Sequence, residues 1–187
     1  MSQDRVPPGQ KVTTRFPVLH EGTVPSFDPS KWDFIVDGAV NRNLKFTWEE
    51  FKSLPAVTII SDFHCVTGWS RFDNRWEGVR FSAVAKMCEP DPKAISVFVS
   101  AEGGYTTSLL LKDMLDDDVL LAYRFNGAPL EPGHGGPLRL IVPKKYAYKS
   151  AKWVRKVTLM TEHELGYWEV KGYSDSADPW KEERYSR

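Results

Sequence analysis

Cysteine is scarce in this sequence, and so are long apolar runs and any excess of one charge. Cys65 and Cys88 are the two cysteines among 187 residues, which excludes a disulfide framework and paired CxxC zinc or redox motifs. Basic and acidic residues each number 25, so no global field directs the chain to nucleic acid or an anionic membrane. No run approaches the ~18 apolar residues that a membrane-spanning helix needs.

The amino-terminal segment also lacks the features of an export signal. Residues 1–11 are polar, contain Pro7 and Pro8, and have neither an apolar core nor a twin arginine. We therefore expect a cytoplasmic protein whose two thiols stay free.

The length and composition predict one domain, residues 1–187, because 41% hydrophobic residues in 187 suffice for a core. Five of the 13 prolines fall within residues 1–30, which predicts an extended N-terminal arm laid over the domain. Residues 174–187 are polar and are expected to form a C-terminal tail on the surface.

Short runs of β-branched and aromatic residues alternate with short helical segments. The runs predict strands at residues 32–37, 56–61, 95–100, 119–126, 138–142 and 156–161. Helices are expected after Thr47, which forms a capping box with Glu50, and over residues 82–88 and 111–115. Asn126-Gly127 predicts a hairpin turn. The pattern predicts an α+β fold with a mixed or mainly antiparallel sheet system and short helices.

Cys65 directly follows a predicted strand and precedes Thr67 and Gly68, a position from which a side chain can face a pocket. A cysteine thiolate is a ligand for soft metal ions. The alternative is a buried structural cysteine, since free cysteine is among the most buried residues. Cys88, on an apolar helix face, fits that alternative, and His64 is expected to point to the opposite side of the strand from Cys65.

Three glycines in four positions, Gly133, Gly135 and Gly136, surround His134 and precede Arg139. Such a segment lets backbone approach a ligand closely and exposes N–H groups to anions, while Arg139 offers a bidentate fork. A plain glycine turn is the alternative. The segment matches neither the dinucleotide-binding nor the Walker pattern.

Residues 144–156 contain six basic residues in 13 and no acidic one, interleaved with aromatic residues. Three interpretations are open. The segment could bind single-stranded nucleic acid by stacking and phosphate contacts, or form a solvated basic face. Alternatively Ser150, Lys152 and Arg139 could hold one compact phosphate.

Four segments together resemble, in order and spacing, the molybdopterin domain of the sulfite oxidase family. They are HCVTGWS around Cys65, GYTTSL from Gly104, HGGPLRLIVP from His134 and YAYKSAKWV from Tyr146. The chain is similar in particular to small stand-alone bacterial members and to the molybdenum subunit of periplasmic methionine-sulfoxide reductases. The resemblance implies a sulfite-oxidase-type molybdopterin-binding fold that holds one molybdenum–pterin cofactor, or its tungsten analogue.

The resemblance also implies roles for individual residues. Cys65 matches the cysteine ligand to the metal, and Tyr173 matches, by its spacing from His134, a tyrosine that faces the metal. The residues that match pterin or phosphate contacts in the family are His20, Ser100, His134, Arg139, Ser150, Ala151 and Lys152.

This sequence departs from the sulfite oxidase pattern where substrate is recognised. Leu19 stands where those enzymes have an active-site arginine, and Gly68-Trp69-Ser70 replaces their Asn-Arg-Arg, with one arginine nearby at Arg71. No haem domain or CxxCH motif is present in this sequence, so we expect electrons to pass to an external partner. Arg71 and Tyr173 are the expected groups for holding an oxyanion or relaying a proton.

The function expected from these features is oxo transfer on a small sulfur- or nitrogen-containing substrate, catalysed at a molybdenum–pterin centre. The alternatives are a molybdopterin storage or assembly module without turnover and, less favoured, a nucleic-acid-binding domain that uses residues 144–156. Cys65 favours the enzyme, because storage needs a grip on the pterin and no metal thiolate. Zero net charge argues against the nucleic-acid alternative.

Overall fold

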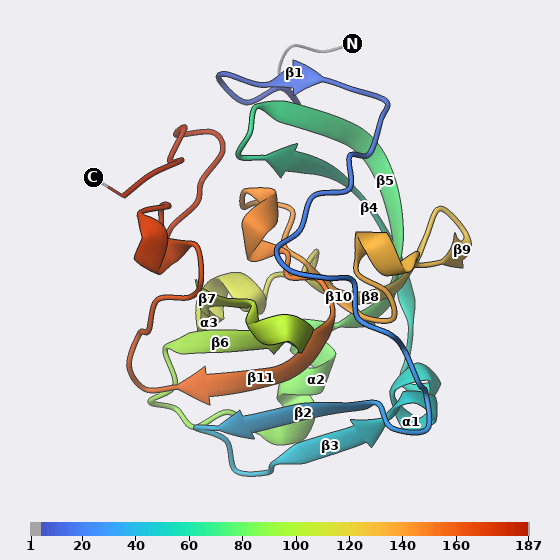
Figure 1. Cartoon of the computed structure of the whole chain (residues 1–187). Helices are drawn as coiled ribbons and strands as arrows, with labels where there is room; N and C mark the ends of the chain where they lie inside the picture. Colours follow the sequence, from blue (N-terminus) through green and yellow to red (C-terminus); the bar gives the residue numbers. More distant parts are fainter. Residues whose placement is uncertain (1–4, 187) are drawn as a thin grey trace.

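The computed structural model describes residues 5–186, which form two β-sheets with a few short helices (Figure 1). One sheet has the order β1-β5-β8-β10, with β4 on β5 and β9 on β8, and the other has the order β3-β2-β11-β6-β7. Most strand pairs are antiparallel, and β1–β5 and β2–β11 are parallel. The expected α+β class is confirmed, although the strands divide between two sheets instead of one system.

The strands are short apart from one hairpin. The first sheet contains β1 (Lys11–Val12), β4 (Val57–Cys65), β5 (Trp69–Arg80), β8 (Leu120–Phe125), β9 (Ala128–Pro129) and β10 (Arg139–Ile141). The second contains β2 (Asp33–Gly38), β3 (Leu44–Thr47), β6 (Ser96–Ala101), β7 (Thr106–Leu110) and β11 (Val154–Met160).

The helices are few and short. They are α1 (Trp48–Ser53), α2 (Phe81–Cys88) and α3 (Leu111–Met114), with one-turn 3-10 helices η2 (Glu102–Gly104), η3 (Pro132–His134), η4 (Ala147–Lys149) and η5 (Glu169–Lys171). None of the helices in residues 5–186 has the length and apolar character of a membrane span. The capping box at Thr47 and Glu50 forms as expected.

The sequence pattern missed β1, β3, β5, β7 and β9. In two of them, β5 and β7, polar residues occupy buried positions. In β5, Ser70 and Asn74 are fully buried, and the Asn74 amide donates to the carbonyls of Ser61 and Arg71. In β7, Thr107 is also fully buried. Hydrogen bonding makes burial of these side chains possible, so apolar alternation does not mark the strands.

The apolar residues form two clusters that support the sheets. The larger lies between the second sheet, α1, α2 and part of the first sheet, with Phe34, Phe81 and Leu140 among its fully buried members. The smaller surrounds Trp76, and Phe16 of the N-terminal arm packs onto it with its ring 5.5 Å from that of Phe63. The arm is therefore held on the rest of the molecule by packing.

The C-terminal segment differs from the expected surface tail. Ala177 is fully buried, and its carbonyl accepts a hydrogen bond from the backbone of Tyr146. Ser174 is also buried, and its carbonyl accepts from the Tyr148 hydroxyl. The segment is polar in composition, but hydrogen bonds to its backbone carbonyls hold it against the domain, and composition does not predict such bonds.

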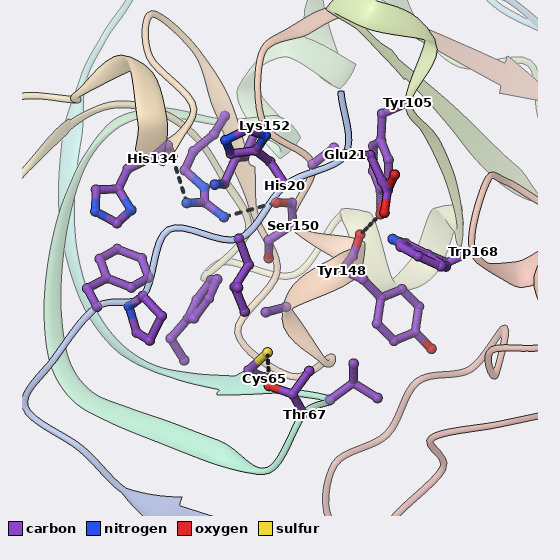
Figure 2. Close-up of a pocket in the computed structure, with 18 of the residues that line it drawn as sticks. His20, Glu21, Cys65, Thr67, Tyr105, His134, Tyr148, Ser150, Lys152 and Trp168 are labelled. Carbon is purple, nitrogen blue, oxygen red and sulfur yellow. Dashed lines mark hydrogen bonds between the residues drawn. The ribbon is translucent and has the colours of Figure 1, made fainter. Parts of the chain in front are cut away.

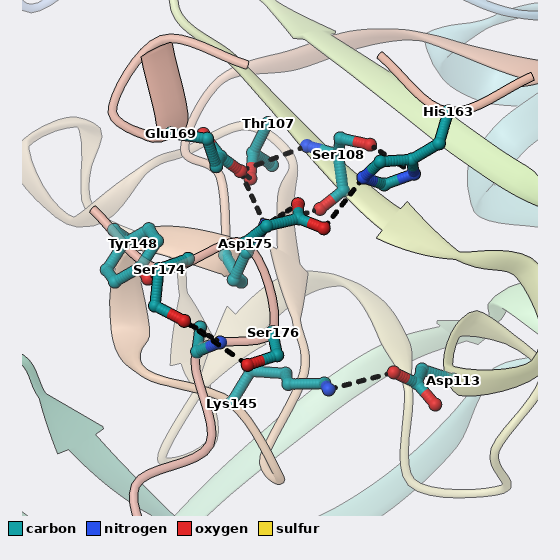
Figure 3. A network of polar contacts seen from close by, with 12 residues as sticks. Thr107, Ser108, Asp113, Lys145, Tyr148, His163, Glu169, Ser174, Asp175 and Ser176 are labelled. Atoms are coloured by element: carbon teal, nitrogen blue, oxygen red, sulfur yellow. Dashed lines mark hydrogen bonds and ion pairs between the residues drawn. The ribbon is translucent and has the colours of Figure 1, made fainter. Parts of the chain in front are cut away.

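A buried ion pair between Lys149 and Glu169 holds η4 and η5 against the second sheet. Figure 3 shows Glu169 with its partners Thr107 and Ser108. Lys149 and Glu169 have fully buried side chains, with Nζ 2.6 Å from Oε1. The same carboxylate oxygen accepts from Thr107 and from the Ser108 backbone, and Lys149 also donates to the Ser108 carbonyl and to Asp175. The network therefore joins η4, β7 and η5.

We expect Lys149→Met to lower the free energy of unfolding by about 3–5 kcal/mol, because it leaves the buried Glu169 carboxylate without its counter-charge. Replacing both members, as in Lys149→Met with Glu169→Leu, should recover much of this loss. Urea unfolding of the three proteins measures both effects. A single variant within about 1 kcal/mol of wild type would show that the pair does not support the fold.

Candidate active site

A cavity of about 400 Å³ opens between the N-terminal arm and the loops that follow the strands of both sheets (Figure 2). Its walls come from residues 16–21, 63–69, 134–139, 147–153 and 168–173, with Tyr105 between them. The size is that of a site for a small organic molecule. Segments far apart in the sequence therefore converge on one space.

Cys65 is the last residue of β4, and its thiol reaches the cavity wall. The side chain is buried, and its Sγ lies 3.1 Å from the Thr67 hydroxyl. Within residues 5–186, no group of three or more His, Cys, Asp and Glu side chains is arranged to hold a metal ion. A metal bound by Cys65 would therefore take its other ligands from a cofactor or from solvent.

His64 and Cys88, the two other residues considered as ligands beside Cys65, do not reach the cavity. His64 is buried outside the cavity, with Nδ1 2.8 Å from the Ser70 hydroxyl, and burial lowers its pKa. Cys88 lies in the apolar core, where its thiol donates to the Ala85 carbonyl and burial raises its pKa. Cys65 is thus the cysteine that reaches the cavity.

Lys152 lies at the other end of the cavity from Cys65 (Figure 2), and Arg139, which also lines the cavity, adds a second positive group. Arg139 donates to the carbonyls of His134 and Ser150, at 2.7 and 3.1 Å, and Lys152 donates to that of Gly133 at 2.6 Å. Neither forms an ion pair with a carboxylate in the described part of the chain. This end is therefore a concentration of buried positive charge without a protein counter-ion.

Burial and mutual repulsion lower the pKa values of the basic groups at this end of the cavity. Burial lowers the pKa of Arg139 to about 9. Burial, and then repulsion by Arg139, lower the pKa of Lys152 to about 7. The pKa of His134 is also lowered, first by burial and then by Lys152 and Arg139. An anion bound here would reverse each of these shifts.

Two buried nitrogen atoms at this end have no hydrogen-bond partner among residues 5–186. They are Nε of Arg139 and Nδ1 of His134. The His134 ring also stacks on Phe16, with 4.3 Å between the ring centroids. Buried polar atoms are rarely left unpaired, so these two atoms are candidates for contact with a ligand.

The glycines around His134 serve the protein backbone itself. A Cβ atom on Gly136 would lie 2.1 Å from the Leu130 carbonyl oxygen, and Gly135 has a φ of +108°. The loop therefore needs glycine to fold back on itself, which supports the plain-turn alternative for these residues. The loop nevertheless brings His134 to the cavity wall.

The remaining side chains around the cavity are mostly aromatic. Tyr105 donates to the Tyr148 carbonyl, and Tyr148 donates to the Ser174 carbonyl. Burial raises the pKa of both phenols, so both keep their protons. Tyr173 is the third tyrosine of the wall, and its hydroxyl forms no hydrogen bond within the described residues. Tyr173 is therefore free to donate to a ligand.

Eight of the ten residues expected from the sequence line this cavity. They are His20, Cys65, His134, Arg139, Ser150, Ala151, Lys152 and Tyr173. Ser100 lies outside it, in β6, opposite Thr106 and Lys156 of the neighbouring strands.

Arg71 also lies outside the cavity. Its guanidinium contacts the Asn74 side chain and the Thr14 carbonyl and sits over the rings of Phe16 and Phe125. The expectation that Arg71 holds an oxyanion is not met by this geometry. Arg71 instead links β5 to the N-terminal arm, through Thr14 and Phe16.

Several cavity residues were not singled out from the sequence. Tyr105 and Tyr148 fall inside the quoted motifs GYTTSL and YAYKSAKWV, so the motifs pointed to them indirectly. Phe16 and Trp168 reach the cavity from segments with no such motif. Only the packing of the arm and of the loop before η5 brings them there.

The basic segment 144–156 does not form a basic surface. Lys149 is buried and Lys152 faces the cavity. The other four basic residues each have a carboxylate partner, Lys144 with Asp116, Lys145 with Asp113, Arg155 with Asp33 and Glu102, and Lys156 with Asp37. Stacking and phosphate contacts along a single strand would need these charges free, so the nucleic-acid alternative loses its support.

Most of the cavity wall lies within the part of the chain that a known family model matches, and Phe16, Pro17, Leu19, His20 and Tyr173 lie outside it. Residues 21–168 match the model described as oxidoreductase molybdopterin binding domain. The chain is 46% identical to the uncharacterized oxidoreductase YuiH of Bacillus subtilis (strain 168), over 97% of this chain and 92% of that protein.

More distant relatives and one solved structure extend the comparison. The chain is 27% identical to the MsrP catalytic subunit of the protein-methionine-sulfoxide reductase of Pseudomonas syringae pv. tomato, over 85% of this chain and 55% of that protein. The sulfane dehydrogenase SoxCD of Paracoccus pantotrophus superposes with a TM-score of 0.68 at 21% identity, over 75% of this chain and 41% of that one. That likeness concerns the fold alone. With the family model matched over most of its length, this chain belongs to the oxidoreductase molybdopterin-binding domain family.

Proposed function

We propose that this chain binds one molybdenum–pterin cofactor and catalyses oxo transfer on an uncharged sulfoxide or N-oxide, with electrons supplied by an external carrier. The observation that carries the proposal is the distribution of charge in the cavity. Lys152 and His134 lie at one end, whereas Cys65 and Thr67 lie at the other (Figure 2). Arg139 joins the first end through its hydrogen bonds to the carbonyls of His134 and Ser150.

The residues of the cavity fit such a cofactor at both ends. A pterin phosphate is an anion, and the end with Arg139 and Lys152 has positive charge without a carboxylate partner. The unpaired Nε of Arg139 and Nδ1 of His134 offer further contacts. A cysteine thiolate is the soft ligand that such a metal takes from a protein, and Cys65 reaches the cavity wall.

When bound, the cofactor supplies two-electron oxo-transfer chemistry, and the protein supplies binding, orientation and electrostatics. Lys152 and Arg139 would hold the phosphate by charge-assisted hydrogen bonds. Cys65 would hold the metal. Trp168 and Tyr148 would limit water around the substrate, and the free Tyr173 hydroxyl would donate a hydrogen bond to the substrate oxygen.

The substrate class follows from the cavity wall beside Cys65, which has no positively charged side chain among residues 5–186. Beside Cys65 the cavity is lined by Val66, Thr67 and Trp69, and Arg71 points away from it. An anionic substrate such as sulfite would have no arginine here to replace its hydration. A neutral oxide needs one hydrogen-bond donor and an apolar wall, and Tyr173 with Trp168 provide both. The sulfoxide reductase MsrP among the relatives is consistent with this class.

We expect protein made in a cofactor-competent host to carry about one molybdenum or tungsten per chain. Cys65→Ser should lose most of the metal and the activity, because a neutral hydroxyl is a poor replacement for a soft thiolate. Cys88→Ser is the matched control and should keep its metal, because Cys88 lies in the core. Elemental analysis per chain measures both. Equal metal content in the two variants would contradict the assignment of Cys65.

We expect cofactor-free protein to bind sulfate at the end of the cavity with Lys152. Affinity should fall as the pH rises from about 6 to about 9, because Lys152 loses its proton around its lowered pKa of about 7, while sulfate stays a dianion. Lys152→Met should weaken binding about tenfold at the lower pH and remove most of this dependence. Calorimetric titration measures both.

The control for this titration is Lys144→Met, which removes a surface lysine paired with Asp116. It should bind sulfate as the wild type does at every pH. If Lys152→Met and wild type share one affinity and one pH profile, the anion site lies elsewhere.

We expect sulfite to be a poor substrate and a neutral sulfoxide a better one. Each absent charge-assisted contact costs about 1.5–3 kcal/mol, which is about one to two powers of ten in binding. Steady-state assays with artificial electron carriers compare sulfite oxidation with sulfoxide reduction. Sulfite turnover with a kcat/KM near about 10⁶ M⁻¹ s⁻¹ would overturn the proposed substrate class.

A further inference from the structure

The two ends of the chain meet at the turn that carries Cys65. From the N-terminal side, the Gln10 amide donates to the Cys65 carbonyl at 3.1 Å, and the Lys11 backbone donates to the Gly68 carbonyl at 2.9 Å. From the C-terminal side, Arg184 donates through Nη1 to the Val66 carbonyl. The turn between β4 and β5 is therefore held from both sides.

Arg184 also ties the two ends to each other. Its Nη2 donates to the Gly9 carbonyl at 3.2 Å. A Cβ atom on Gly9, which has a φ of +67°, would lie 2.8 Å from that same nitrogen and 2.5 Å from the Glu182 carboxylate. A side chain at position 9 would therefore displace the Arg184 and Glu182 side chains from this contact.

The environment of Arg184 fits a fixed guanidinium rather than a mobile surface charge. Its side chain is 17% exposed and lies over the Tyr146 ring, with 5.3 Å from Cζ to the centroid. Its two terminal nitrogens bond to carbonyls of two different segments. A planar fork can span two acceptors in this way, whereas a lysine ammonium is a single point charge.

The same segment holds Tyr173. The Ser174 backbone donates to the Arg184 carbonyl at 3.1 Å. Tyr173 and Tyr185 form a β-bridge, and their rings lie 5.3 Å apart. Arg184 is therefore connected, through one short segment, to both cavity groups that would face the reacting atoms.

We propose that Arg184 is a positioning residue that, together with Gln10, fixes the Cys65 thiol and the Tyr173 hydroxyl relative to each other. It touches neither cofactor nor substrate and acts through the backbone of the turn at residues 65–68. The role rests on the proposed function, in which Cys65 binds the metal. The clamp itself is a property of the chain without cofactor and can be tested there.

The test uses cofactor-free protein carrying Cys88→Ser, so that iodoacetamide at fixed pH reports on Cys65 alone. Arg184→Gln should be alkylated about tenfold faster, because loss of a charge-assisted bond lets the turn open locally. Arg184→Lys, which keeps the charge and one donor, should fall between. Lys181→Gln changes an exposed lysine of the same segment and should react as the parent does.

Small additions of urea separate local opening of the turn from loss of the whole fold. Local opening exposes little surface, so the alkylation rate of Arg184→Gln should hardly change with urea well below the unfolding midpoint. A rate that rises with the urea dependence of global unfolding would overturn the proposal, as would alkylation at the parent rate. If Arg184→Gln does not fold, Gln10→Ala removes a bond to the same turn and should accelerate alkylation.

Metal retention then separates the two hypotheses. In protein loaded with cofactor, Arg184→Gln should lose metal during dialysis about tenfold faster than Lys181→Gln. Equal rates of loss would contradict the positioning role. A parent protein that never carries metal would instead contradict the proposed function, while the alkylation results would still decide whether the clamp exists.

Discussion

The Arg139 guanidinium is buried and forms no ion pair with a carboxylate of residues 5–186, and the cavity is organised around that charge. Removing a cation from water costs several kcal/mol unless its surroundings compensate. Here the compensation comes from the carbonyls of His134 and Ser150 and from the rings of Phe63 and Trp76. These groups belong to four separate parts of the chain. The contacts that compensate the buried Arg139 charge therefore hold these four parts of the chain together around the cavity.

The buried positive charge of Arg139 is only partly compensated, so one end of the cavity keeps a positive potential. Lys152 adds a second positive charge beside Arg139, and both have pKa values below their usual range. The remaining positive potential can be relieved by a bound anion, which would restore the charge of Lys152. Around Cys65 the cavity wall itself has no charged side chain among residues 5–186. A ligand with an anionic group at one end and a metal at the other fits this gradient in one orientation only.

The sequence predicted the cavity residues better than the strands that carry them. Cys65, His134, Arg139 and Lys152 stand in motifs whose order and spacing are distinctive, so the amino-acid sequence alone was enough to single them out. The strand β5 could not be predicted in this way, since its buried Ser70 and Asn74 are made tolerable only by partners elsewhere in the fold.

Two of the expectations that the structure does not meet, those for Arg71 and for the C-terminal segment, share one physical origin. Arg71 was expected at the substrate because it is close to Cys65 in sequence, but side chains alternate along a strand and this one faces the arm. Residues 174–187 were expected to form a surface tail because they are polar, but Ser174 and Ala177 are buried and backbone hydrogen bonds hold the segment to the domain. Both depend on partners distant in sequence, and composition carries no information about such partners.

A mechanical constraint follows from where Cys65 lies. It ends β4, and among residues 5–186 the one strand paired with β4 is β5, so the thiol lies at the tip of a hairpin with no described strand on its outer side. Turns of this kind are the parts of a sheet that open most easily, whereas the role proposed for Cys65, that of a metal ligand, requires a position fixed to a fraction of an ångström. In this chain β1 and Gln10 reinforce the hairpin from one side and Arg184 from the other. The two chain ends thus supply the rigidity that the sheet does not provide at this edge.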